Sequence, residues 1–134
     1  MADRVHRVTM FKIADEGQKQ RLIEQYKVLG SSHKKVRFSF LSPLIFVNGN
    51  SISNPTPWNG KPYILSMVVG PAMDDPRSQG YTLVAKTEFA SLEDMRYYDD
   101  ECEAHNALKV FVKENLDVGG VMSVYFEPKA VAFL

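Results

Sequence analysis

The 134-residue sequence predicts a single α+β domain with the element order β-α-β-β-α-α-β. Two kinds of periodicity support this prediction. Four segments alternate between apolar and polar residues as strands do, and three segments repeat their apolar residues at helical spacing. The composition agrees, because 45% hydrophobic and 24% charged residues are typical of one globular domain that buries its own core.

The first predicted elements are a strand and a helix. Residues 5–13 alternate, and one face of this strand holds Val5, Arg7, Thr9, Phe11 and Ile13. Asp15 and Gln18 have the spacing of a capping box, which predicts that a helix begins there. Gly30 is a typical helix end. The apolar positions of this helix are Leu22, Ile23, Tyr26 and Leu29.

Two further strands are expected at residues 62–69 and 81–89, separated by turn residues at 70–80. In the earlier strand Tyr63 and Leu65 are expected on one face. Ser91 follows the later strand, and its hydroxyl can accept a hydrogen bond from the first turn of a helix that ends near residue 100.

A third helix is predicted over residues 101–116, and the glycine pair at 119–120 ends it. The last strand is residues 121–127. This order is the ferredoxin-like pattern, in which the helices cover one face of a four-stranded antiparallel sheet. The other face also carries apolar residues, so we expect a second copy to cover it and form a homodimer, a dimeric α/β barrel.

Residues 31–60 do not fit this scheme. The segment contains a basic cluster, an apolar run broken by proline, and a turn-rich stretch before Gly60. We interpret it as an insertion in a single domain that spans residues 1–134. A small hairpin, a poorly ordered loop and an artefact of exon boundaries remain open as explanations.

Charge and motifs narrow the function. The 16 basic and 16 acidic side chains balance, which argues against a nucleic-acid partner. No apolar run is long enough for a membrane span, and no secretory signal is visible, so we expect a cytoplasmic protein. Phosphate-binding and hydrolase motifs are absent, and we expect no cofactor.

Metal binding is considered for one cluster, residues 99–103 with His105. Its ligand types are mixed, and acidic residues at a helix start are ordinarily there because they interact favourably with the helix dipole. We therefore expect no metal. His105 itself lies on an apolar helical stripe with Leu108, where a neutral imidazole serves either as a general base or as a core residue.

Four segments together resemble the stress-responsive A/B barrel family of the dimeric α+β barrel superfamily. They are residues 5–13 (VHRVTMFKI), 80–84 (GYTLV), 89–95 (FASLEDM) and 103–105 (EAH). The stretches 61–66 (KPYILS), 77–82 (RSQGYT) and 95–105 (MRYYDDECEAH) look most like the fungal members. The match covers residues 5–30 and 60–128, and the segment between them is longer than the linker usual in the family.

The resemblance implies a dimer with a cavity between each sheet and its helices. In plant polyketide cyclases of the family, a tyrosine and two histidines perform aldol chemistry in that cavity. His105 matches the helix histidine, and Tyr98 is similar in place to the tyrosine. Arg7 stands where the cyclases have their strand histidine, and because arginine stays protonated it cannot act as a base.

Two functions follow as hypotheses, and the sequence leaves open whether the chain is an enzyme. The first is a non-catalytic, stress-related protein whose small cavity is filled or binds a hydrophobic ligand. The alternative is a cyclase, aldolase or lyase that acts on a carbonyl ligand, in which His105 is the base, Tyr98 holds the oxygen and Arg7 stabilises an enolate or binds a carboxylate. The residues expected to line the cavity are Thr9, Phe11, Ile23, Tyr26 and Leu108.

Overall fold

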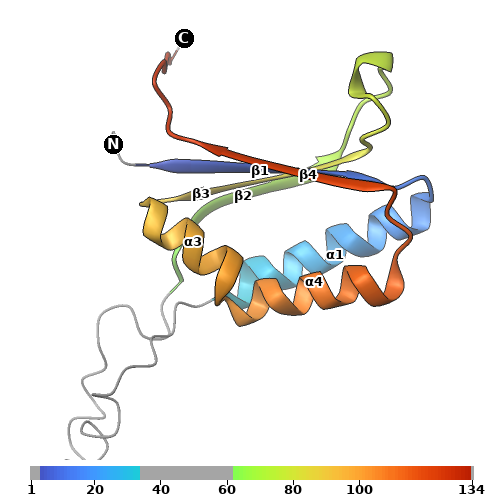
Figure 1. The fold of residues 1–134 in the computed structure, drawn as a ribbon, viewed down its shortest axis with the longest axis horizontal. Coiled ribbons are helices and arrows are strands. Elements are labelled where there is room, and N and C mark those ends of the chain that lie inside the picture. Colours follow the sequence, from blue (N-terminus) through green and yellow to red (C-terminus); the bar gives the residue numbers. More distant parts are fainter. Residues whose placement is uncertain (1–3, 34–61, 134) are drawn as a thin grey trace, which may run out of the picture.

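In the computed structural model, which describes residues 4–33 and 62–133, a curved sheet lies on a layer of helices (Figure 1). The helices are α1 (Glu16–Ser32), α3 (Leu92–Asp100) and α4 (Glu103–Asn115). The strands are β1 (Val5–Lys12), β2 (Ile64–Pro71), β3 (Leu83–Phe89) and β4 (Gly120–Phe126), with a short 3₁₀ helix η2 (Pro76–Ser78) between β2 and β3. The predicted order of strands and helices is confirmed.

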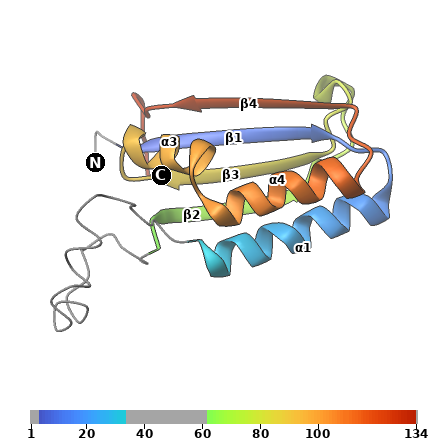
Figure 2. The ribbon, with the colours of Figure 1, turned by 60° about the horizontal axis from the view of Figure 1, so that its bottom comes forward.

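The four strands pair antiparallel in the order β2-β3-β1-β4. All three helices lie on the same side of the sheet, and β4 forms the edge away from α1 (Figure 2). This is the ferredoxin-like arrangement that the sequence predicts. Because β1 and β3 are the central strands, their helix-facing residues form the floor of the core.

The alternation of β1 explains which side chains face the helices. Val5, Thr9 and Phe11 are buried, as the pattern predicts for one face of a half-covered strand. The register with β4 places Arg7 opposite Tyr125 and Thr9 opposite Ser123. Side chains from β1 and β4 therefore meet on the helix side of the sheet.

The first helix is longer than predicted. It continues through Gly30 to Ser32, so the first two residues of the expected insertion are helical. A Cβ atom at Gly30 would lie 2.8 Å from Cε of Met67 on β2. Gly30 therefore lies inside the helix and does not end it, with the flexible end of the Met67 side chain against it.

A bulge in β2 changes the expected face of one residue. The pairing with β3 shifts between Ile64 and Ser66, so the simple alternation predicted from Tyr63 onward is broken. Tyr63 is buried, whereas Leu65 is exposed. The sequence carries no marker for this extra residue.

The predicted capping box forms only in part. The Asp15 side chain accepts a hydrogen bond from the backbone N–H of Gln18, as expected. The Gln18 side chain, however, bonds Asp117 in the loop between α4 and β4, from which it also accepts a backbone N–H. Gln18 thus links the start of α1 to the loop that leads into β4.

His33 follows α1 and lies against the residue that precedes β2. Its Nδ1 accepts a hydrogen bond from the backbone N–H of Tyr63 at 3.3 Å, and the two rings meet edge to face. The residues on either side of the undescribed segment, His33 and Tyr63, therefore lie next to each other. Of the expected insertion, Ser31, Ser32 and His33 are described, and residues 34–60 lie outside the described residues.

The sheet face opposite the helices is apolar and uncovered. His6 of β1 lies on this face, and its ring stacks on that of Phe126 with the ring centres 5.3 Å apart. Lys86 and Glu88 of β3 lie on the same face. The apolar residues on this face are Val8, Met10, Val68, Val84, Met122, Val124 and Phe126. Of the helices in the described ranges, none has the length and apolar character needed to cross a bilayer.

Replacing either of two threonines with valine is expected to change the free energy of unfolding in opposite directions. Thr87 Oγ1 is buried without a hydrogen-bond partner among the described residues, so Thr87→Val is expected to leave stability unchanged or raise it by about 1 kcal/mol. Thr82 Oγ1 accepts from Ile13 N–H and donates to the Ile13 carbonyl, so the matched Thr82→Val is expected to cost about 1–3 kcal/mol. Urea unfolding measures both. A larger loss at Thr87 than at Thr82 would contradict the assignment.

Candidate functional site

A small cavity of about 200 Å³ lies between the helix side of the sheet and helices α1 and α4. Strand β1 and the edge strand β4 form one wall, and α4 with Tyr26 of α1 forms the other. Its lining residues are Arg7, Thr9, Phe11, Tyr26, His105, Leu108, Lys109, Val112, Val121 and Ser123. Of the five residues predicted to line a cavity, Thr9, Phe11, Tyr26 and Leu108 do so.

Ile23 is the predicted cavity residue that is not among the lining residues. It precedes Tyr26 by three positions, which places it about 4.5 Å further along the axis of α1. There it is half-buried and packs against the hydrophobic core. Ile23 is therefore part of the core beside the cavity and not of its lining.

Arg7 is a nearly buried cation whose partners fix its position. Its Nη2 lies 2.9 Å from a carboxylate oxygen of Asp99, and its Nη1 donates a hydrogen bond of 2.6 Å to Thr9 Oγ1. The guanidinium also lies over the ring of Tyr98, 5.2 Å from its centre. With only 11% of its side chain exposed, Arg7 is held by these contacts at the inner wall of the cavity.

His105, near the start of α4, is 3% exposed and lines the cavity. Its Nδ1 is 2.7 Å from the backbone oxygen of Tyr98. A carbonyl only accepts, so Nδ1 carries the proton, and in the neutral ring Nε2 is a bare acceptor. No residue in the described part of the chain bonds Nε2.

The pKa of His105 is lowered to about 3. Burial is the main cause, and the charges of Arg7 and Lys109 lower the pKa further, while the bond to the Tyr98 carbonyl raises it.

The structure brings Tyr98 to His105 but not into the cavity lining. The two rings stack with centres 3.7 Å apart. Burial raises the pKa of the Tyr98 hydroxyl above its usual range, and its oxygen has no hydrogen-bond partner among the described residues. The tyrosine that lines the cavity is Tyr26, whose pKa burial also raises. Tyr98, on α3, therefore contacts His105 without lining the cavity itself.

Ser123 of β4 is a cavity residue that the sequence analysis does not predict. Its Oγ lies 2.7 Å from Thr9 Oγ1, opposite it in the sheet. The only signal in the sequence is that Ser123 is the polar position between Val121 and Tyr125 in an alternating strand. That signal becomes useful only once the pairing of β4 with β1 is known.

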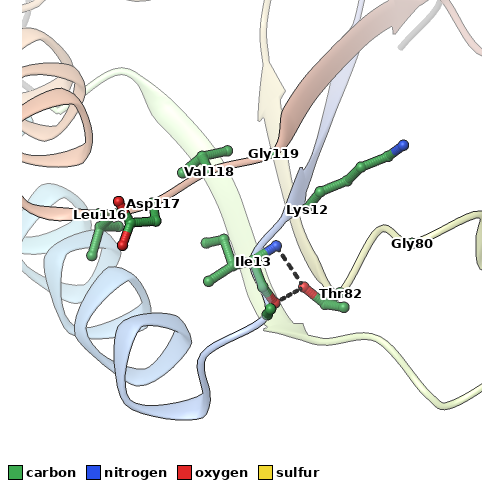
Figure 3. A pocket seen from close by; sticks show the side chains of 9 residues that line it. Lys12, Ile13, Gly80, Thr82, Leu116, Asp117, Val118 and Gly119 are labelled. Carbon is green, nitrogen blue, oxygen red and sulfur yellow. Dashed lines mark hydrogen bonds between the residues drawn. The ribbon is translucent and has the colours of Figure 1, made fainter.

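A larger hollow of about 670 Å³ lies at the far end of the sheet, beside Ile13, Thr82 and the loop that precedes β4 (Figure 3). Its polar groups are already bonded. Thr82 bonds the backbone of Ile13, and the Gly119 N–H bonds the Lys12 carbonyl. Lys12 lies over the ring of Tyr81. The smaller cavity is therefore the better candidate site, because it is lined by Arg7, by the Thr9–Ser123 pair and by His105, whose Nε2 has no partner among the described residues.

The acidic run considered for metal binding is dispersed in the structure. Asp99 pairs with Arg7, Cys102 is buried, and His105 bonds a backbone oxygen. Within residues 4–33 and 62–133, no three histidine, cysteine or acidic side chains gather to form a metal site.

Solved structures share this fold. A dimeric ferredoxin-like protein of unknown function from Jannaschia sp. is 17% identical, with a TM-score of 0.58 over 93% of this chain and 99% of that one. Hydroxynitrile lyase from Passiflora edulis is 9% identical, with a TM-score of 0.61 over 98% and 99% of the two chains. These likenesses confirm the ferredoxin-like fold.

Sequence comparison identifies the family. The Fusaristatin A biosynthesis cluster protein of Gibberella zeae is 44% identical over 130 residues, which are 97% of this chain and 77% of the relative. Residues 56–127 match the Stress responsive A/B Barrel Domain. The chain therefore belongs to the stress-responsive A/B barrel domain family, as its sequence motifs predict.

Proposed function

We propose that the protein binds a small, partly apolar molecule in the cavity beside His105. The observation that carries this proposal is the hydrogen bonding of the two nitrogens of the His105 ring. Nδ1 is committed to the Tyr98 carbonyl, and Nε2 has no partner among the described residues. An acceptor that lines a cavity and has no protein partner is available to a ligand that donates a hydrogen bond. The apolar side chains Phe11, Leu108 and Val112 would contact the rest of the ligand.

Binding is better supported than proton abstraction. To act as a base, His105 must hold a proton during the reaction. At pH 7, protonating an imidazole whose pKa is about 3 costs about 5 kcal/mol. An effective general base has a pKa near the working pH. The buried His105 therefore suits a hydrogen-bond acceptor.

Cyclase, aldolase or lyase chemistry is the second candidate. It is favoured by the bare Nε2 and by the two named relatives, one from a biosynthesis cluster and one a lyase. In this candidate His105 removes a proton beside a carbonyl and Tyr26, the tyrosine in the cavity lining, replaces Tyr98 as the group near the oxygen. The ligand itself would have to raise the pKa of His105.

We also infer a homodimer formed through the uncovered sheet face. Val8 and Val124 are opposite each other on that face, as are Met10 and Met122. Contiguous apolar side chains on a sheet face are an aggregation hazard when they remain in water. The dimeric ferredoxin-like protein from Jannaschia sp. has the same fold. A second copy that buries more than about 1,000 Å² would remove the hazard.

The dimer is tested by a matched pair of charge substitutions. Val124, on the uncovered sheet face, and Val110, on α4, are 49% and 46% exposed. We expect wild type and Val110→Glu to sediment as dimers at micromolar concentration and Val124→Glu as a monomer, because only Val124 would bury its charge. A wild-type monomer contradicts the inference, as does a dimeric Val124→Glu variant.

The cavity function is tested with His105→Asn, whose amide can still donate to the Tyr98 carbonyl. Phenol is the probe that donates a hydrogen bond, and toluene is the apolar control. We expect this variant to bind phenol about tenfold more weakly in NMR titrations, with toluene binding unchanged. Equal phenol binding by both proteins would exclude His105 as the acceptor.

The same two proteins separate binding from catalysis. Exchange of the α-protons of pentan-2-one in D₂O is expected to proceed at the buffer rate with either protein. An acceleration of about 100-fold by wild type that the variant lacks would instead support His105 as a general base.

Stability should depend on pH through His105. The unfolded chain takes up a proton near pH 6.5, whereas the folded chain does so only near pH 3. The stability contributed by the neutral ring is therefore complete above pH 6.5 and is lost as pH falls toward 3, by at most about 5 kcal/mol. His33, whose pKa burial also lowers, acts in the same direction. We expect His105→Asn to lose less stability than wild type between pH 7 and 4 in urea unfolding, and parallel curves would contradict this.

A further inference from the structure

Only one direction of the hydrogen bond between Thr9 and Ser123 gives the buried hydroxyl proton of Thr9 an acceptor. Arg7 Nη1 donates to Thr9 Oγ1, and because a guanidinium is always protonated this direction is fixed. Thr9 is 3% exposed, and Ser123 Oγ is the one acceptor within reach of its proton in the described residues. If Ser123 donated instead, the Thr9 proton would be buried without an acceptor, at a cost of about 1–3 kcal/mol.

The direction of the first bond therefore fixes the second. Arg7 donates to Thr9, and Thr9 donates to Ser123. The hydroxyl hydrogen of Ser123 is then not used in the Thr9–Ser123 bond and can be donated to another acceptor. Ser123 is exposed on β4 and lines the cavity. Successive hydrogen bonds of this kind polarise one another, so the charge of Arg7 strengthens the Ser123 hydroxyl as a donor.

The charges around the cavity favour an electron-rich oxygen at this donor. Arg7 and Lys109 are lining residues, and no carboxylate lines the cavity in the described part of the chain. Asp99, which is paired with Arg7, is not among the lining residues. An acceptor oxygen of the ligand therefore meets a donor hydroxyl in a locally positive environment.

We propose that Ser123 is the specificity-determining hydrogen-bond donor of this cavity and that Thr9 is its positioning residue. Together with the acceptor Nε2 of His105, Ser123 selects small molecules that carry both a hydroxyl group and a carbonyl oxygen. The hydroxyl donates to His105 and the carbonyl accepts from Ser123. This assignment rests on the proposed binding function and adds to it the class of ligand.

Two probes of nearly equal shape test the assignment. In 4-hydroxyacetophenone a carbonyl oxygen replaces two hydrogens of 4-ethylphenol, and both probes keep the hydroxyl for His105. We expect wild type to bind the ketone about fivefold more tightly in protein-observed NMR titrations. Ser123→Ala should bind both probes with equal affinity.

Thr9 variants test the relay. Thr9→Val removes the group that orients Ser123 without touching the ligand's oxygen, so it should also abolish the preference for the ketone. Thr9→Ser keeps the hydroxyl and should restore the preference, which a merely structural role of the Thr9 methyl group would not do. Circular dichroism spectra establish that each variant is folded, and if Thr9→Val unfolds, the comparison of Ser123→Ala with wild type still decides the donor assignment.

Each result is decisive. Equal binding of the two probes by wild type, or a preference retained in Ser123→Ala, overturns the assignment of Ser123 while leaving the cavity as a binding site. A preference lost in Ser123→Ala but retained in Thr9→Val overturns the positioning role of Thr9. Failure of wild type to bind either phenol overturns the proposed function and this assignment together.

Discussion

A guanidinium that cannot lose its proton lies between the sheet and the helices, and the cavity is built around it. Removing such a charge from water is expensive unless partners surround it. Asp99 of α3, Thr9 of β1 and the ring of Tyr98 provide these partners to Arg7. The ion pair links α3 to β1, and the hydrogen bond to Arg7 orients the threonine hydroxyl.

The same cation shapes the chemistry of its neighbour. His105 lies in a buried site close to positive charge, which keeps its ring neutral. The Tyr98 backbone oxygen then selects the tautomer. A neutral acceptor and a polarised hydroxyl therefore share one cavity, and neither requires a metal or a second histidine. At the position where the resemblance predicts a strand histidine, Arg7 provides a permanent charge that acts through hydrogen bonds and an ion pair.

Much of the fold can be predicted from the sequence because it depends on local periodicity. The alternation of β1 correctly assigns Thr9 and Phe11 to the covered face, and the helical stripe assigns Leu108 to the core. The errors arise where the structure departs from a local rule. Gly30 resembles a helix end but lies inside α1, and Leu65 leaves the core because of a bulge in β2.

The candidate site is less predictable for the same reason. Resemblance to the family indicates Tyr98, whereas the packing of α1 on the sheet places Tyr26 in the cavity lining. Ser123 cannot be identified as a site residue from the sequence of its own strand, because its role depends on the register between β1 and β4. Its chemistry depends further on an arginine two residues away from its partner Thr9.

The strand order also determines when this cavity comes into existence. β1 is made early, but its partner on the cavity side, β4, follows more than 100 residues later, as the separation of Thr9 and Ser123 shows. Pairing over such a distance is slow, because the intervening chain must be closed into a loop. During synthesis, or in a folding intermediate with β4 detached, Arg7 and Thr9 face solvent along an unpaired strand edge. The cavity is therefore complete only in molecules in which β4 has paired with β1.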